Sequence, residues 1–134
     1  MKAYAIVIKD HPVSEHGFSI LQKSSEEVKN NFKIERFMAF TSNSAINFFH
    51  NQKNNIRWTW PHEGAEFDIV TSLTKKAYQT ALNPYVRLAC FLSHYHLWKI
   101  CIEKKESILI LEHDTIFIDK FKDPQINDGF ICGI

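Results

Sequence analysis

Short continuous apolar runs alternate with amphipathic segments along the chain, an order typical of α/β proteins. The clearest apolar runs are residues 3–8 and 107–111, and polar residues follow both of them. Residues 32–40 alternate as a strand does, while residues 14–30 and 85–104 have helical patterns. The repeated strand–helix–strand order predicts an α/β fold with a mostly parallel sheet flanked by helices.

Polar residues and a proline mark where the helices should begin. Ser14 is placed to cap the first helix, although Gly17 weakens its first turn. Thr41-Ser42-Asn43-Ser44 supplies cap residues for a short helix that follows the second strand. Pro84 suits the first turn of the long helix, because its fixed φ is already helical.

The long helix over residues 85–104 carries two groups that are costly to bury. A helical projection places aromatic residues on one side and polar residues on the other, namely Phe91, Tyr95 and Trp98 against Ser93, His96 and Lys99. Arg87 and His94 fall near the middle of the apolar side, where each needs a partner. That partner is either a backbone carbonyl or carboxylate, in a structural role, or a ligand, in a site.

The size and composition of the chain favour a single compact domain over residues 1–134. It has 134 residues, 45% hydrophobic and 13% aromatic, which excludes intrinsic disorder. A formal net charge of +1 argues against duplex nucleic acid as the partner. No apolar run is long enough for a membrane helix, and no signal peptide is recognisable, so we expect no transmembrane segment and a cytoplasmic location. The three cysteines Cys90, Cys101 and Cys132 lack CxxC spacing, and we expect buried thiols.

The irregular stretch over residues 51–66 contains Trp58 and Trp60 before a proline turn. Such a loop suits either a lid that contacts a ligand or a pair of indoles that close the edge of the core. The last residues, 129–134, have the pattern of a further strand.

The triplet Glu112-His113-Asp114 separates two apolar runs, 107–111 and 115–118. We expect both runs to be strands. On an extended segment, carboxylates two residues apart point to the same side and offer oxygen ligands to Mg²⁺ or Mn²⁺. His113 between them could add a nitrogen ligand, which Mn²⁺ tolerates better than Mg²⁺. A turn rich in charge between two strands is the structural alternative. The triplet and Asp10 both follow predicted strands, where parallel sheets bind their ligands.

Other catalytic motifs are missing from the sequence. Neither GxGxxG nor GxxxxGK[ST] occurs, and there is no HExxH or GxSxG. The sequence therefore gives no support to a dinucleotide site, a P-loop, a zinc protease or an α/β-hydrolase.

The segment from Leu88 to Trp98, LACFLSHYHLW, resembles the G-C-x-L-S-H-x-x-x-W segment of the family 25 glycosyltransferases. These are the lipopolysaccharide-biosynthesis and collagen-galactosyltransferase type. Residues 107–114, SILILEHD, are similar to the I-L-I-L-E-D-D that follows in that family, with His113 in place of the middle aspartate. Ala89 and Thr41-Ser42 also differ from the family's usual Gly and Asp-Gly.

The resemblance implies a GT-A-like nucleotide-diphospho-sugar transferase fold. It implies transfer of a sugar from a nucleotide-diphospho-sugar donor, usually UDP-linked, to a saccharide or hydroxylated acceptor. It also implies a divalent metal, Mn²⁺ or Mg²⁺, at Glu112, His113 and Asp114. The donor pocket would include Asp10, Thr41, Arg87, Ser93 and His94. No residue is assigned as the catalytic base.

The resemblance implies a longer chain, because family members continue well beyond the acidic triplet. In this chain only 20 residues follow Asp114. We therefore expect the donor-binding half of a glycosyltransferase, incomplete at its C-terminus. The alternative is a non-catalytic nucleotide-sugar-binding or interaction module, and a metal-dependent phosphohydrolase is a weaker third possibility. An exposed sheet edge would favour a homo-oligomer.

Overall fold

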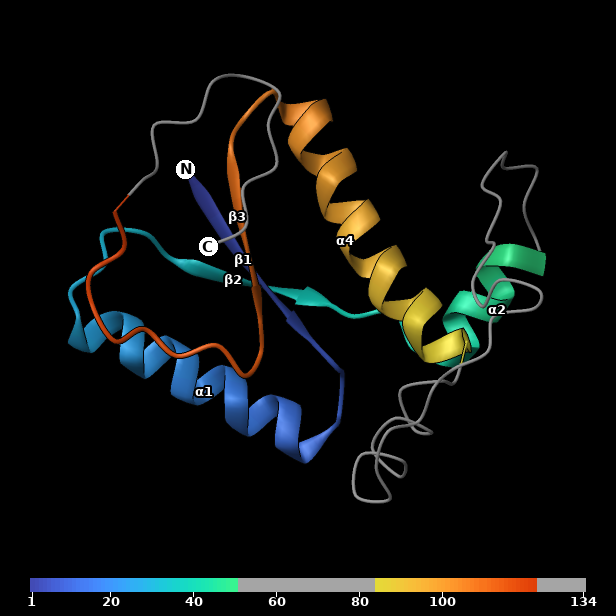
Figure 1. The fold of residues 1–134 in the computed structure, drawn as a ribbon, viewed down its shortest axis with the longest axis horizontal. Coiled ribbons are helices and arrows are strands. Elements are labelled where there is room, and N and C mark those ends of the chain that lie inside the picture. Colours follow the sequence, from blue (N-terminus) through green and yellow to red (C-terminus); the bar gives the residue numbers. More distant parts are fainter. Residues whose placement is uncertain (51–83, 123–134) are drawn as a thin grey trace, which may run out of the picture.

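The computed structural model describes residues 1–50 and 84–122 of the chain, and Figure 1 shows their arrangement. The expected alternation of strands and helices is present, which confirms the α/β class. The elements are β1 (Lys2–Val7), α1 (Pro12–Glu27), β2 (Ile34–Met38), α2 (Ser42–His50), α4 (Pro84–Lys104) and β3 (Ile108–Glu112).

The three strands form a parallel sheet in the order β2-β1-β3, as the buried apolar runs predict. In the register of the sheet, Val7 of β1 is opposite Met38 of β2, and Ile6 is opposite Glu112 of β3. The carboxyl ends of all three strands therefore meet at one edge. The central strand β1 is buried from Ala3 to Val7, which explains its continuous apolar sequence.

The helices α1 and α4 lie on opposite sides of the sheet (Figure 1). Side chains that alternate along the strands divide between two apolar clusters. Phe18 and Leu21 of α1 pack with one set, including Ala5 and Leu111. Leu97 of α4 packs with the other set, Tyr4, Ile6, Phe37, Ile108 and Ile110. A third cluster joins α2 to the beginning of α4 through Ala45, Leu88, Ala89 and Leu92.

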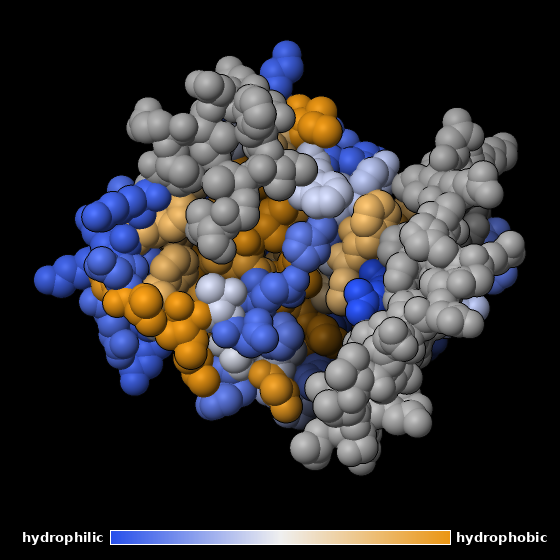
Figure 2. All heavy atoms as spheres, in the orientation of Figure 1, coloured by the Kyte–Doolittle hydropathy of each residue, from blue (hydrophilic) through white to orange (hydrophobic). Residues whose placement is uncertain are grey.

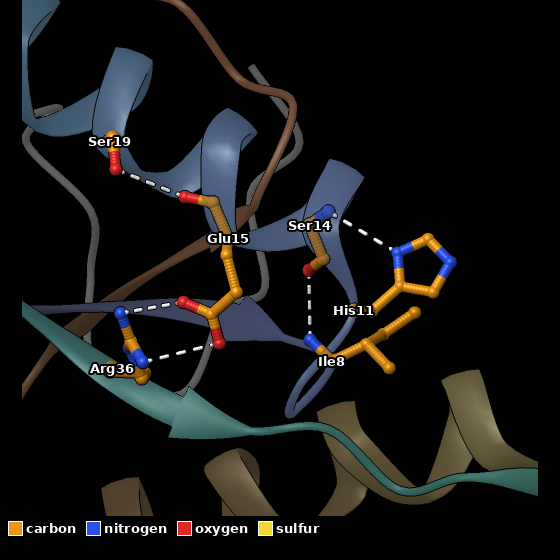
Figure 3. A network of polar contacts seen from close by, with 6 residues as sticks. All are labelled: Ile8, His11, Ser14, Glu15, Ser19 and Arg36. Carbon is orange, nitrogen blue, oxygen red and sulfur yellow. Dashed lines mark hydrogen bonds and ion pairs between the residues drawn. The ribbon is translucent and has the colours of Figure 1, made fainter.

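The helix α1 begins earlier than predicted, with His11 and not Ser14 as its N-cap. His11 has extended backbone and Pro12 follows it, a combination that starts a helix at the proline. The buried hydroxyl of Ser14 instead accepts a hydrogen bond of 2.9 Å from the Ile8 N–H (Figure 3). The side chain of Ser14 thus joins the end of β1 to the first turn of α1.

The prediction of which residues of α4 face the core was wrong. Its buried residues are Leu88, Ala89, Leu92, Ser93 and Leu97. The small residues and leucines enter the core, while the bulky rings of Phe91, Tyr95 and Trp98 stay half-buried and contact one another. Arg87 is exposed and His94 is half-buried, so neither is placed inside an apolar face.

The strand expected over residues 115–118 does not form. The Thr115 N–H bonds to the carbonyl of Glu112 at 3.1 Å, so the chain turns where β3 ends. It then runs back beside α1 (Figure 1). Ser24 of α1 accepts a bond of 3.1 Å from the Phe117 N–H, and Asn30, just after α1, one of 2.8 Å from the Phe121 N–H. These two side chains satisfy backbone groups that a sheet would otherwise pair.

The surface of the described part includes apolar side chains among hydrophilic ones (Figure 2). Ile118 is 96% exposed, Ile102 73% and Val13 68%. None of the helices described here is long and apolar enough to cross a membrane. Self-association and the single-domain assignment stay predictions. Trp58, Trp60, Cys132 and the strand expected at 129–134 lie outside the described residues.

Candidate functional site

Most of the predicted site residues come to the carboxyl edge of the sheet. Asp10 follows β1, Thr41 follows β2, and the triplet 112–114 begins at the last residue of β3. The helix α4 passes this edge, where His94 reaches Glu112. The fold thus assembles, from separate parts of the sequence, the region where open α/β sheets bind ligands.

Among the described residues, Glu112 of β3 and His94 of α4 form a polar contact between these two elements. The His94 Nε2 atom lies 3.5 Å from the Glu112 Oε1 atom, and the side chains are 32% and 49% exposed. Glu112 faces α4 because it continues the alternation of Ile108 and Ile110, which pack on that side. The other ring nitrogen, Nδ1, lies 3.1 Å from the carbonyl oxygen of Cys90.

The two contacts of the His94 ring constrain its protons. A neutral imidazole has one N–H donor and one acceptor nitrogen. If Nδ1 donates to the Cys90 carbonyl, Nε2 presents its lone pair to the Glu112 carboxylate, and two acceptors face each other. The opposite tautomer creates the same conflict at the carbonyl. A proton or another cation between Nε2 and Oε1 removes the conflict.

The pKa of the Cys90 thiol depends on the charged groups around it. Partial desolvation raises the pKa of its thiol, the negative charge of Glu112 raises it further, and the positive charge of Arg87 lowers it. Glu112 and Arg87 therefore both lie within electrostatic range of the thiol. The prediction that Cys90 and Cys101 are buried was wrong, because Cys90 is exposed and Cys101 half-buried.

His113 lies on the other side of the sheet, against α1. A Cβ atom built on Gly17 would come within 2.7 Å of the His113 carbonyl oxygen and 3.2 Å of its ring Cδ2 atom. The glycine thus leaves the space in which His113 packs. The sequence alone indicates Gly17 only as a weak point of the helix, although a glycine inside a first turn is also a signal of close approach.

The acidic triplet is therefore divided between the two faces of the sheet. Glu112 is the last residue of β3 and faces α4, whereas His113 and Asp114 form the turn that follows. The extended geometry from which we expected Glu112 and Asp114 to share a side is not seen, because the chain turns at that point.

Ser93 is in the interior and not on the surface of the site. It is 1% exposed, accepts a hydrogen bond of 2.9 Å from the Phe40 N–H and donates one of 2.9 Å to the Ala89 carbonyl. Its hydroxyl holds the chain just after β2 against α4. The helical projection places Ser93 on the polar side of the helix, and nothing in the local pattern distinguishes a buried serine of this kind.

Thr41 and Asp10 occupy the loops that follow β2 and β1. Thr41 caps α2: its Oγ1 accepts from the Ser44 N–H at 3.3 Å, and its own N–H donates to the Ser44 hydroxyl at 2.7 Å. Asp10 is exposed, with a φ of 56° in the tight turn between β1 and α1. Both side chains lie at the edge where the strands end.

The donors at this edge fit a divalent metal only in part. In residues 1–50 and 84–122, no three His, Cys, Asp or Glu side chains come together as a ready-made metal site. Glu112 and His94 nevertheless supply one carboxylate oxygen and one imidazole nitrogen, a donor set that suits Mn²⁺. A cation at these two side chains would need further ligands, and the predicted metal stays a prediction.

Comparison with known proteins gives a family for the chain. The family model described as glycosyltransferase family 25 (LPS biosynthesis protein) matches residues 15–127, which include most of α1 and every later described element. Neither the curated proteins nor the solved structures gave a match. The small parallel sheet flanked by helices is consistent with a glycosyltransferase domain. The chain belongs to glycosyltransferase family 25, the family of LPS biosynthesis proteins.

Proposed function

We propose that this chain binds a nucleotide-diphospho-sugar, UDP-linked, and transfers its sugar to a saccharide or hydroxylated acceptor with a divalent metal. The observation that carries this proposal is the position of Glu112, an acidic residue at the carboxyl end of β3 whose carboxylate faces His94 of α4. A carboxylate at that edge has the placement and chemistry expected of a metal ligand beside a bound diphosphate.

The surrounding residues have roles that follow from their places. Glu112 binds the metal, with Asp114 available from the adjoining turn, and the ion when bound neutralises negative charge on the leaving diphosphate. Arg87, close enough to act on Cys90, brings positive charge to the first turns of α4 and orients the donor phosphates. Asp10 and Thr41 border the donor pocket from the loops after β1 and β2. Ser93 acts indirectly, by fixing the loop that begins at Phe40.

The test is a titration of the protein with UDP in the presence and absence of Mn²⁺, followed by calorimetry and by the melting temperature. We expect UDP to stabilise the protein with Mn²⁺ and much less without it, since binding to the folded state raises the free energy of unfolding. Glu112→Gln should remove the effect of the metal, because an amide is a weaker ligand. Equal responses to UDP with and without Mn²⁺ would contradict the metal-dependent function.

A non-catalytic nucleotide-sugar-binding module is the second candidate. It is favoured by one observation: within the part of the chain that the structure describes, no third metal-ligating side chain joins Glu112 and His94. A panel of UDP-sugars with a saccharide acceptor separates the two functions, since release of UDP with formation of a glycoside would exclude the module. Donor binding with no turnover over the whole panel would favour it.

A further inference from the structure

The described residues bring a histidine other than His113 to the acidic end of β3. His94 comes from the middle of α4, and its Nε2 atom lies 3.5 Å from the Glu112 Oε1 atom. His113, which directly follows Glu112 in the sequence, packs its carbonyl and ring against Gly17 of α1. The two candidate nitrogen donors therefore lie on opposite faces of the sheet, and one of them meets the carboxylate.

We propose that His94, and not His113, supplies the nitrogen ligand of a divalent cation whose oxygen ligand is Glu112. This inference rests on the proposed metal-dependent function and adds a residue of α4 to the metal site. The rest of the coordination shell comes from the diphosphate of the donor and from water, as is usual for hard cations that are held by few protein groups.

The spacing of the two atoms suits a shared ion. Metal bonds of about 2.1 Å to nitrogen and oxygen, at the angle of about 90° that an octahedral cation prefers, place the two ligand atoms about 3.0 Å apart. The observed separation of Nε2 and Oε1 is 3.5 Å. The two side chains therefore need to move about 0.5 Å toward each other to bring both atoms to bonding distance of one octahedral cation.

The second nitrogen of His94 supports the same assignment. A histidine that binds a metal through one ring nitrogen commonly donates its other N–H to a backbone carbonyl, which fixes the ring and its tautomer. The Nδ1 atom of His94 lies 3.1 Å from the Cys90 carbonyl oxygen. With Nδ1 as the donor in this contact, the lone pair of Nε2 faces Glu112, and a cation between the two acceptors removes their repulsion.

Cys90 is a poor competitor for a hard cation, because its soft sulfur suits Mn²⁺ and Mg²⁺ less well than a carboxylate oxygen does. His96 offers a comparison on the same helix. Its Nδ1 atom lies 2.9 Å from the Leu92 carbonyl oxygen, but its ring packs against Phe40 and Phe48.

The experiment is electron spin echo spectroscopy of the full chain loaded with Mn²⁺ and UDP, which detects a ¹⁴N nucleus bonded to the metal. We expect an imidazole nitrogen coupling in the unaltered protein that is lost in His94→Gln and retained in His113→Gln and His96→Gln. The affinity for Mn²⁺ should fall by about tenfold or more in His94→Ala, because even groups outside the ligand shell are worth about 10- to 100-fold. Far-ultraviolet circular dichroism and melting curves check that each variant is folded.

Three outcomes would overturn the assignment, and they differ in what else they affect. Bound Mn²⁺ without a nitrogen coupling removes the nitrogen ligand and leaves the proposed function in place. A coupling that is lost in His113→Gln but kept in His94→Gln assigns the ligand to the turn. Failure of the protein to bind Mn²⁺ at all in the presence of UDP removes both this inference and the metal-dependent function.

Discussion

The carbonyl oxygen of His113 lies so close to Gly17 of α1 that a Cβ atom at residue 17 would come within 2.7 Å of it. The turn after β3, which carries Asp114 and begins at Glu112, thus rests directly on the backbone of a helix. Two further bonds hold the chain beyond this turn, one to Ser24 of α1 and one to Asn30 just after that helix. The helix α1 therefore positions the acidic end of β3 as well as covering one face of the sheet.

Replacing Gly17→Ala tests that relationship. Alanine is favoured over glycine inside a helix by about 1 kcal/mol, but the added methyl group meets a backbone oxygen that cannot rotate away. We expect a net loss of about 1–3 kcal/mol in the free energy of unfolding, measured with urea, because overpacking forces the turn to move. Affinity for Mn²⁺ with UDP should fall as well.

The control for this variant is His16→Ala, at an exposed neighbouring position of the same helix. It should change the free energy of unfolding by no more than about 0.5 kcal/mol. A Gly17→Ala protein that is more stable than the original and binds Mn²⁺ equally well would show that the turn does not depend on this close approach.

Ser93 should matter for stability more than its place in the sequence suggests. In Ser93→Ala the part-buried N–H of Phe40 loses its acceptor, and a donor that loses its partner away from water costs about 1–3 kcal/mol. The matched control is Ser19→Ala, which removes an exposed hydroxyl that donates to the carbonyl four residues earlier, as Ser93 also does. Chemical denaturation of both variants should show a loss confined to Ser93→Ala, and equal losses would contradict it.

The fold could be predicted from the sequence where a signal is local. Continuous burial of β1 leaves an uninterrupted apolar run, and Thr41 caps α2 with its own side chain. The failure at residues 115–118 has a physical cause: their β-branched and aromatic side chains suit a strand, but the backbone N–H of Phe117 bonds to Ser24 and not to a neighbouring strand. Because Ser24 is 93 residues away from Phe117 in the sequence, no local sequence pattern predicts this hydrogen bond.

The candidate site shows the same division. Glu112 could be predicted because an acidic residue directly after a buried strand is a visible pattern. Its pairing with His94 could not, because these residues come together only when α4 packs on the sheet, in a register set by Leu97 and Ile110. The sequence also could not show whether His94 or His113 meets Glu112. Alternation along β3 puts Glu112 and His113 on opposite faces of the sheet, but it does not show which of the helices α1 and α4 covers each face.

The segment beyond the turn should loosen when Asn30 is shortened. In Asn30→Ala the Phe121 N–H loses its acceptor, so we expect faster hydrogen exchange at the amides near residues 117–121. Asn30→Asp is the matched control, because it keeps the oxygen that accepts from Phe121 and loses only the amide that donates to Ser25. Exchange that is equally slow in both variants would mean that the aromatic contacts with Phe32 are sufficient to hold the segment.

The pKa of the Cys90 thiol is sensitive to the charges at the acidic end of β3. Desolvation raises its pKa most, the carboxylate of Glu112 raises it further, and the guanidinium of Arg87 lowers it. Removing the carboxylate in Glu112→Gln should therefore lower the pKa, increase the thiolate fraction at a fixed pH near 8 and accelerate alkylation by iodoacetamide a few-fold. Removing the guanidinium in Arg87→Gln should raise the pKa and slow the reaction. The rates are followed by mass spectrometry of the peptide that contains Cys90, and modification of Cys101 in the same samples provides the internal reference. If neither variant changes the ratio of the two rates, Glu112 and Arg87 do not share one electrostatic environment with Cys90, and the arrangement of α4 beside β3 is different from the one described.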